Sequence, residues 1–271
     1  MTRLTNQQKI QIAKYIADDN LENINRISEK VHIRQSFYTK YGKRILDIIV
    51  SLIALIITSP INLVLAVCTF IDVGRPIFFK QKRPGKDGRE FTIVKFRNMT
   101  NATDANGNLL PAKDRVTKFG KFVRKTSLDE LLNYWSILKG DMSLIGPRPL
   151  KQEYLCRYSE RHKMRLAVKP GLECPLMHDT DGGRLGWQEQ FENDVWYVEN
   201  VSFIVDCKML FRLFKLVFDK RSRKHRSEAT KYGFMGYDSE GVAINVEQIP
   251  KIYIDRLISE ESLVAATLEN A

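Results

Sequence analysis

The chain has 271 residues, of which 44% are hydrophobic and 28% are charged. This length and balance supply one or two ordinary hydrophobic cores and exclude a disulfide-stapled miniprotein, a collagen and a fully disordered chain. The 43 lysine and arginine residues outnumber the 32 aspartate and glutamate residues, so the net charge of +11 favours anionic partners, whether phosphate-bearing small molecules, nucleic acid or acidic lipid headgroups.

Residues 1–39 form a polar N-terminal extension whose apolar residues have a modest helical periodicity. The extension lacks the early apolar core of a secretory signal peptide, so no export signal is expected. The chain has four cysteines and no CxxC pair. This argues against a disulfide framework and a thiolate zinc site, and favours a reducing compartment.

A long apolar run from Ile45 to Ile71 predicts a membrane segment within residues 40–75. As one straight helix the run would rise about 40 Å, enough to cross a hydrocarbon core of roughly 30 Å. Ser59 and Pro60 interrupt it near its middle, and a proline there predicts a kink. Both flanks are basic, as expected of segments on the cytoplasmic side: Lys43 and Arg44 before, and Arg75, Lys80, Lys82 and Arg83 after. We therefore expect a re-entrant hairpin that enters and leaves by one face; a spanning helix is the alternative.

The residues after the apolar run predict a compact polar domain with short strands. Two β-rich runs, 76–85 and 89–99, flank a turn that contains glycine, and residues 100–112 form a loop. Three helices are then expected, at 116–125, 127–138 and 150–166, with an extended Gly-Pro-Arg-Pro segment at 146–149.

Residues 203–220 predict a helix of a different kind. Large apolar side chains are interleaved there with basic ones, Lys208, Arg212, Lys215 and Lys220. The pattern suits an amphipathic helix lying in a membrane interface, and equally the amphipathic helix of a protein core. A basic run and a mixed C-terminal extension follow at 221–271, which either packs or is partly disordered.

The densest group of candidate catalytic residues lies at the expected start of the helix 127–138. Ser127 and Glu130 have capping-box spacing, which places Asp129 in the first turn, where backbone N–H groups and the helix dipole favour a carboxylate and an anionic ligand. Capping boxes also open many ordinary helices, so the neighbouring charges decide the interpretation. Nearby basic residues can hold phosphate oxygens while the Asp-Glu pair holds Mg²⁺: Lys95, Arg97, Arg124 and Arg148.

The order of these features resembles that of a known family. The motifs are Lys43-Arg44, the apolar run with Ser59-Pro60, QKRPG at 81–85, KFRNM at 95–99, RKTSLDELLN at 124–133, LKGDMSLIGPRPL at 138–150, KPG at 169–171 and DVWYVENVSFIVDCKML at 194–210. Together they resemble the bacterial sugar transferases called monotopic phosphoglycosyl transferases. The resemblance implies an enzyme of the bacterial cytoplasmic membrane whose catalytic domain faces the cytoplasm. It implies transfer of a sugar 1-phosphate from a UDP-sugar to undecaprenyl phosphate with release of UMP, which begins a surface polysaccharide or glycoconjugate.

The resemblance also implies roles for individual residues. Asp129 matches the nucleophile that forms a covalent phosphosugar intermediate, and Glu130 matches its partner near a Mg²⁺ ion that both carboxylates hold. Arg124 and Arg148 match phosphate-binding positions of the family. Lys95 and Arg83 are weaker candidates for the same role. The resemblance implies that Lys43 and Arg44 form a basic pair at the lipid headgroups. It implies that Ser59 and Pro60 break the membrane helix.

One segment departs from the family pattern. After the Pro-Gly pair the family commonly continues with a Gly-Trp-Ala-Gln-Val-Asn-Gly-Arg-like segment, whereas this chain reads LECPLMH at 172–178. The nearest remnants are Arg184 and Trp187, so the departure concerns recognition of the donor. Residues 178–183 are either part of an altered specificity loop or a plain Asp/Gly turn. Cys174 and His178 have a spacing that allows a shared metal, although ordinary loop residues are the simpler interpretation.

These inferences predict an α+β fold that is mostly helical. It comprises a re-entrant membrane hairpin at 40–75, a catalytic domain at 76–220 with short β-strands and interfacial amphipathic helices, and extensions at 1–39 and 221–271. The expected partners are a UDP-sugar, undecaprenyl phosphate and membrane lipid, with Mg²⁺ as cofactor, and the sequence allows a homodimer. The alternative function is a catalytically inactive, membrane-bound interaction protein of a glycan assembly pathway, which the altered segment at 172–187 favours and the retained Asp129 region opposes. The sequence has no recognised nucleic-acid-binding motif, so nucleic acid is not an expected partner.

Overall fold

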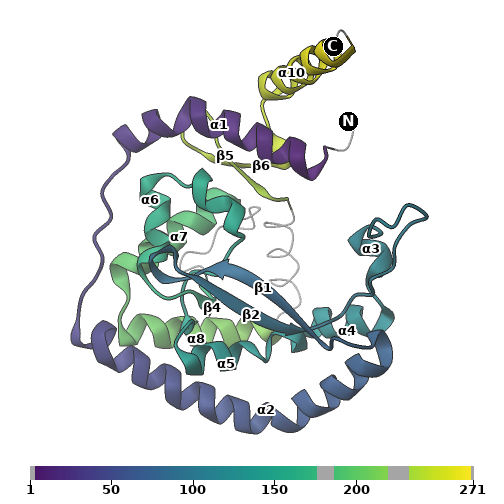
Figure 1. Ribbon diagram of the computed structural model, residues 1–271. Helices are drawn as coiled ribbons and strands as arrows, with labels where there is room; N and C mark the ends of the chain where they lie inside the picture. Colours follow the sequence, from purple (N-terminus) through teal and green to yellow (C-terminus); the bar gives the residue numbers. More distant parts are fainter. Residues whose placement is uncertain (1–3, 176–185, 219–231, 270–271) are drawn as a thin grey trace.

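The computed structural model describes residues 4–175, 186–218 and 232–269. The described residues are mostly helical, with three separate two-stranded sheets, so the expected class is confirmed (Figure 1). The helices are α1 (Asn6–Ile27), α2 (Lys43–Val73), α3 (Ala112–Arg115), α4 (Lys118–Thr126), α5 (Asn133–Lys139), α6 (Glu160–Lys163), α7 (Trp187–Asn200), α8 (Phe203–Phe218) and α10 (Lys251–Glu269). The strands are β1 (Phe78–Pro84), β2 (Glu90–Phe96), β3 (Ser143–Ile145), β4 (Gly171–Glu173), β5 (Phe234–Tyr237) and β6 (Ala243–Asn245).

The short strands hold the segments of the middle domain in register. β1 pairs antiparallel with β2, and β3 pairs parallel with β4. The two strands expected at 76–85 and 89–99 are therefore confirmed. The single helix expected over 150–166 is wrong: the structure has a 3₁₀ helix at Gln152–Arg157, the short α6, and a second 3₁₀ helix at Met164–Ala167.

The apolar run forms one continuous helix, and the break expected at Ser59 and Pro60 does not interrupt it. Pro60 lies inside α2 and has no N–H to donate to the carbonyl of Ile56. The hydroxyl of Ser59 donates to that carbonyl at 2.8 Å. Side-chain hydroxyls of this kind satisfy the backbone groups that a proline frees, so the helix continues through the interruption. Figure 1 shows α2 bending round the lower side of the domain without a gap.

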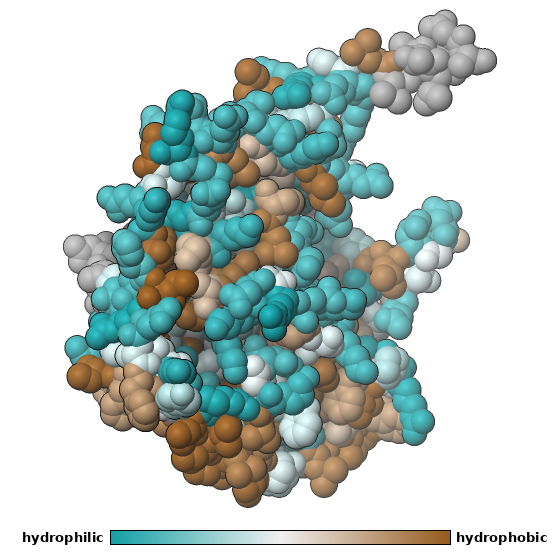
Figure 2. Space-filling view, turned by 60° about the vertical axis from the view of Figure 1, so that its left-hand side comes forward, coloured by the Kyte–Doolittle hydropathy of each residue, from teal (hydrophilic) through white to brown (hydrophobic). Residues whose placement is uncertain are grey.

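The two faces of α2 differ in polarity. Three polar side chains of α2 face the protein: Asp47, Ser51 and Thr69 are each at most 2% exposed, and Asp47 accepts two hydrogen bonds of 2.9 Å from β3. The opposite face carries large apolar side chains, for example Ile57, Leu63 and Ile71, which are 66%, 68% and 77% exposed. Figure 2 shows these brown side chains gathered along the lower edge of the molecule. By length and composition, Tyr38–Val73 is long and apolar enough to cross a membrane.

Both ends of α2 are bonded to the same polar domain. At its start, the ammonium group of Lys43 lies 2.6 Å from the carboxylate of Asp206 in α8, and Arg44 donates to two carbonyls at the end of α5 at 2.7 Å. At its end, Arg97 donates to the carbonyls of the last residues of α2, and Asp72 accepts a hydrogen bond of 2.6 Å from the residue that caps α4. Lys43 and Arg44 thus fasten α2 to the domain, and their expected position at the lipid headgroups stays a prediction.

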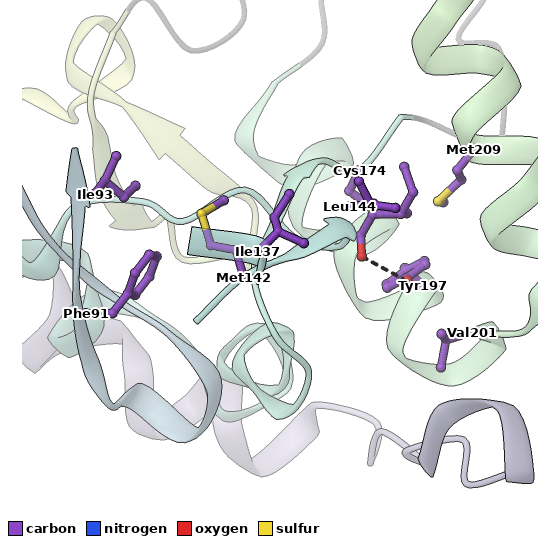
Figure 3. Packing of buried hydrophobic residues seen from close by; sticks show 10 residues of the cluster. Phe91, Ile93, Ile137, Met142, Leu144, Cys174, Tyr197, Val201 and Met209 are labelled. Atoms are coloured by element: carbon purple, nitrogen blue, oxygen red, sulfur yellow. Dashed lines mark hydrogen bonds between the residues drawn. The ribbon is translucent and has the colours of Figure 1, made fainter. Parts of the chain in front are cut away.

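The central core lies above α2, where β2, β3, α5, α7 and α8 meet. Figure 3 shows Phe91, Ile137, Leu144, Tyr197 and Met209 pointing toward one another from these elements. The hydroxyl of Tyr197 donates to a carbonyl of β3 at 3.2 Å, so the one polar atom of this aromatic side chain has a partner in the core.

α8 is amphipathic, as expected, and one of its faces packs in the core; its place in a membrane interface stays a prediction. Asp206 and Met209 are buried against the domain. On the other face Phe203, Ile204 and Phe211 are 55%, 65% and 74% exposed. One face therefore belongs to the core, and the other adds apolar surface next to α2.

The two ends of the chain pack together. Ile16 of α1, Met235 of β5, Ile244 of β6 and Leu257 of α10 share one buried cluster, so the described part of the C-terminal extension is ordered (Figure 1). Trp187 belongs to the adjoining cluster, which joins this pair of extensions to α7. It is 4% exposed and donates its indole N–H to the carbonyl of Tyr232 at 2.9 Å, so it is a core residue here.

Candidate active site

Six of the seven sequence-predicted candidates converge on one place between the β1–β2 hairpin and the chain around α4 and β3. The seventh, Arg97, donates to carbonyls at the end of α2. Arg83 extends from β1 and Lys95 from β2, and both lie on the same face of the hairpin. Arg124 lies in the last turn of α4, and Asp129 and Glu130 lie in the 3₁₀ turn Leu128–Glu130 that follows. The sixth candidate, Arg148, lies on the extended segment after β3.

Glu130 forms ion pairs with two cations. One of its oxygens, Oε1, lies 2.7 Å from Nζ of Lys95 and 2.6 Å from Nη2 of Arg148. Burial by itself raises the pKa of Glu130, but the charges of Arg148 and Lys95 outweigh burial and lower this pKa to about 2. Glu130 is therefore ionised at neutral pH, and its negative charge fixes the two cations in place.

Asp129 is in a different state from its neighbour. It is 8% exposed and has no ion pair with any residue that the structure describes. Burial raises its pKa, and the negative charge of Glu130 adds to that effect, while Lys95 and Arg124 act in the opposite direction. The result is a carboxylate that is more basic than an ordinary aspartate and surrounded by cations that it does not bind directly.

The expected capping box at Ser127 is wrong. Ser127 has a φ of 57° and ends α4 in the left-handed conformation, and its side chain caps no helix. The next α-helix, α5, begins only at Asn133, so Asp129 lies in a 3₁₀ turn between two helices. A capping residue needs an extended backbone, which a left-handed residue does not have. Glu130 points to Lys95 and Arg148 and does not reach back to the backbone of Ser127.

Asn98 links Arg124 to Asp129, and sequence reasoning missed it although it lies in the KFRNM motif. Its side-chain oxygen accepts a hydrogen bond of 3.0 Å from Nε of Arg124, and its side-chain nitrogen lies 3.5 Å from Oδ2 of Asp129. Gly120 makes this arrangement fit, because a Cβ on Gly120 would lie 2.1 Å from the carbonyl oxygen of Asn98. The absence of a side chain lets α4 approach the chain at Asn98 this closely.

Arg148 is held from several directions. Besides Glu130, it meets the carboxylate of Glu173 at 3.4 Å and donates to the carbonyl of Leu172 at 3.2 Å. Its own carbonyl accepts a hydrogen bond of 2.9 Å from Arg165, whose guanidinium forms a fully buried ion pair with Asp194. Glu173 comes from the segment that departs from the family pattern, so the departure reaches the site through a carboxylate.

Arg83 lies beside Arg148 without a carboxylate partner among the described residues. Burial and the charge of Arg148 both lower the pKa of Arg83. Its Nη2 donates to Gln81 at 2.7 Å, whereas its buried Nε has no hydrogen-bond partner in the described part of the chain. Two neighbouring guanidinium groups with a buried free donor are suited to binding phosphate oxygens, because charged donors bind such oxygens strongly.

The residues present are compatible with Mg²⁺ delivered together with a diphosphate. No group of three or more histidine, cysteine, aspartate or glutamate side chains with metal-binding geometry occurs in the part of the chain that the structure describes. Mg²⁺ commonly takes one or two carboxylates and completes its shell with water and substrate phosphates. Asp129 and Glu130 supply that number. His178, Arg184 and the turn at 178–183 lie outside the described residues, while Cys174 is buried and receives a contact from Asn193.

An apolar groove lies on the membrane side of the hairpin. It encloses about 930 Å³ between the last turns of α2 and the start of β1, and Ala66, Phe70 and Phe78 form part of its lining. Arg75 and Lys80 lie at the same groove. Ala66 also packs on the cluster of Leu65, Phe96 and Val123, and residues next to Asp129 pack on that cluster too.

Comparison with known proteins identifies the family. The model of the family described as bacterial sugar transferase matches residues 38–220. The chain belongs to the bacterial sugar transferase family. The resemblance found from the sequence motifs is thereby confirmed, and the extensions at either end lie outside the matched residues.

Several members of the bacterial sugar transferase family are similar to this chain. An uncharacterized sugar transferase, EpsL of Bacillus subtilis, is 41% identical over 72% of this chain and 96% of its own length. A UDP-N-acetylgalactosamine-undecaprenyl-phosphate N-acetylgalactosaminephosphotransferase of Aeromonas hydrophila is 34% identical over 65% of this chain. A UDP-glucose:undecaprenyl-phosphate glucose-1-phosphate transferase of Klebsiella pneumoniae is 36% identical over 62% of this chain. The chain spans 43% and 38% of the length of the last two proteins, respectively.

Proposed function

We propose that this protein transfers a sugar 1-phosphate from a UDP-sugar to undecaprenyl phosphate, with release of UMP, and so begins the synthesis of a surface polysaccharide or glycoconjugate. The observation that carries the proposal is a buried aspartate without an ion pair in the described chain, Asp129, inside a group of four cations. A nucleotide diphosphate sugar brings the negative charge that these cations attract. The names of the similar proteins support the same reaction.

Asp129 is the better nucleophile of the two neighbouring carboxylates. Glu130 shares its charge with Lys95 and Arg148, and its low pKa makes it a weak base. Asp129 has a raised pKa and a carboxylate free to approach phosphorus. In this mechanism Asp129 attacks the phosphorus that bears the sugar, the bond from that phosphorus to the bridging oxygen breaks, and UMP leaves with the bonding electron pair.

The second step returns Asp129 to its starting state. A phosphate oxygen of the acceptor attacks the same phosphorus, the bond to the Asp129 oxygen breaks, and the sugar is left on a lipid diphosphate. Arg148, Arg83 and Arg124 bind the phosphate oxygens during both steps, as charged donors already in position. Asp129 and Glu130 would hold Mg²⁺ together with the substrate, and the ion would further neutralise the phosphate charge.

We propose that α2 enters and leaves the membrane by its cytoplasmic face, so that the catalytic domain lies in the cytoplasm. Support comes from Lys43, Arg44 and Arg97, which bond both ends of α2 to one folded domain. A helix that crosses the bilayer has ends on opposite sides, roughly 30 Å apart along the membrane normal, and these bonds oppose that arrangement. The exposed apolar face of α2 and the outer face of α8 then contact lipid together.

The groove between α2 and β1 suits the polyprenyl chain of the acceptor. Its apolar lining by Ala66, Phe70 and Phe78 matches an isoprenoid, and Arg75 and Lys80 match an anionic lipid. Its position beside the cluster that packs against the Asp129 turn brings the acceptor close to the nucleophile.

The test is release of UMP by the purified protein with Mg²⁺, undecaprenyl phosphate and a panel of UDP-sugars. Wild type should release UMP with one donor, and Asp129→Asn should reduce release by at least a thousandfold without loss of folding. Asp114→Asn, an exposed aspartate in α3, is the matched control and should keep wild-type activity. Turnover in Asp129→Asn would remove the mechanism. Folded wild-type protein that releases no UMP with any donor would instead favour a non-enzymatic interaction protein.

The membrane arrangement has a separate test. Single cysteines are placed at Lys40 and Arg75, before and after α2, in a chain whose Cys68, Cys156 and Cys207 are replaced by serine. A membrane-impermeant thiol reagent should label both positions from the cytoplasmic side of inside-out vesicles. Labelling of the two positions from opposite sides would establish a spanning helix.

A further inference from the structure

A second cavity lies at the other end of α2, away from Asp129. It has a volume of about 970 Å³ and is enclosed by the chain that precedes α2, the first turns of α2, the turn between β1 and β2, and the segment before β4. The family match begins at residue 38, so the part of the wall formed by Ile33 and Arg34 belongs to the N-terminal extension.

The lining of this cavity is rich in positive charge. Four of its cations have no ion pair with any described residue: Arg34, Lys40, Lys86 and Lys169. Lys43 and Arg44 also line it but are already bonded to Asp206 and to α5. Of the two acids in the lining, Asp47 is bonded to β3, which leaves Asp87 to offset the free cations.

Lys169 and Arg44 are held close together. The amine of Lys169 and the guanidinium of Arg44 each lie within 3.4 Å of the place where a Cβ on Gly140 would be. Burial and the charge of Arg44 lower the pKa of Lys169, and Lys86 adds to that effect, while Asp47 and Asp141 act in the opposite direction. Like charges placed this close in a half-buried cavity repel one another, and binding of an anion would relieve the repulsion.

The surroundings of the cavity define the kind of anion. Phe37, Tyr41 and Ile45 are 80%, 49% and 58% exposed beside it, and they continue the apolar outer face of α2. A ligand bound here has an anionic group among lysines and arginines and apolar chains against this exposed surface. Basic cavities next to membrane helices bind the headgroups of anionic lipids in this way.

We propose that this cavity is a binding site for the headgroup of an anionic phospholipid of the membrane, separate from the site at which Asp129 acts. The lipid neutralises Lys86 and Lys169 and fixes the start of α2, together with the N-terminal extension, at the level of the headgroups. The proposal goes beyond the transfer reaction and does not depend on it.

The test measures the melting temperature of the full chain in a neutral detergent. Short-chain phosphatidylglycerol should raise the Tm by about 5 °C at saturation, because a ligand that binds only the folded state stabilises it. Phosphatidylcholine of the same chain length and inorganic phosphate should leave the Tm unchanged. The double variant Lys86→Gln/Lys169→Gln should lose the response to phosphatidylglycerol. Its Tm without lipid should equal or exceed that of wild type, since the variant removes repulsion.

The control variant is Lys113→Gln/Lys121→Gln, which removes the same charge from α3 and α4 and should keep the full response. An equal loss of response in this control would show attraction by overall charge and would overturn the site. A Tm rise with inorganic phosphate would show that the cavity binds a free anion and would overturn the proposal that its ligand is a lipid. An equal response to phosphatidylcholine would overturn the role of charge.

Discussion

Replacing Gly120 by alanine tests how closely α4 has to approach the chain at Asn98. The new Cβ would lie 2.1 Å from the carbonyl oxygen of Asn98, about 1.3 Å short of the 3.4 Å at which ordinary contact begins. The Asn98 oxygen that the new Cβ meets belongs to the backbone, so α4 and the chain at Asn98 have to separate. Arg124 and Asp129 are linked through Asn98, and they are displaced together.

The expected loss is larger in activity than in stability. A misplacement of about 1 Å in a catalytic group costs on the order of 10²-fold in rate, so UMP release should fall about a hundredfold. Overpacking costs about 1–3 kcal/mol, whereas alanine in place of glycine in a helix returns up to about 1 kcal/mol, so the protein stays folded.

The assay compares UMP release and Tm for wild type, Gly120→Ala and Lys121→Ala, an exposed change in the same helix. Lys121→Ala should behave as wild type. Activity of Gly120→Ala within twofold of wild type would refute the argument that the Asn98 contact positions Asp129. A loss of folding in Gly120→Ala would show that the contact supports α4 as a whole.

Three further results are expected. Lys95→Met removes a cation that lowers the pKa of Asp129, so the acid limb of kcat/KM should move to higher pH; movement to lower pH would contradict the assignment. The pKa of Glu130 is lowered to about 2, so its stabilisation is complete above about pH 4.5 and is lost as the pH falls toward 2; in Glu130→Gln the free energy of unfolding should depend less on pH in that window. Ile16→Ala opens a cavity beneath Gly236 and should lower the stability of the unit formed by the chain ends by about 2–5 kcal/mol. Proteolysis of this unit should become faster while UMP release is retained. Loss of UMP release would show that this unit supports the site.

The packing of the two extensions explains how segments outside the family match become part of the molecule. α1 and the β5–β6 pair bury a shared cluster, and Asn20 donates to the carbonyl of Tyr237 at 2.9 Å. Phe234 of β5 packs against Trp187 and Phe191 of α7. The extensions thus cover the helix that follows the altered segment, and they stabilise its start by burial of aromatic side chains.

The sequence by itself determined the elements whose signals are local. The apolar run predicted one long apolar helix, the β-rich runs predicted the β1–β2 hairpin, and the order of motifs resembled the family that the comparison confirmed. These are properties of periodicity, composition and spacing along the chain, which need no knowledge of distant residues. The resemblance to the family, carried by motifs along the chain, implied the roles of Asp129, Glu130 and the cations around them.

The tertiary structure decided what depends on partners far apart in the chain. It showed that Ser127 ends one helix and does not begin another, because Glu130 is drawn to Lys95 and Arg148. It brings Lys43 to Asp206, 163 residues away, and this ion pair fastens the start of α2 to the domain. Local sequence fixes which charges exist, but an ion pair forms only where folding brings the opposite charge and removes water, and that is a property of the whole chain.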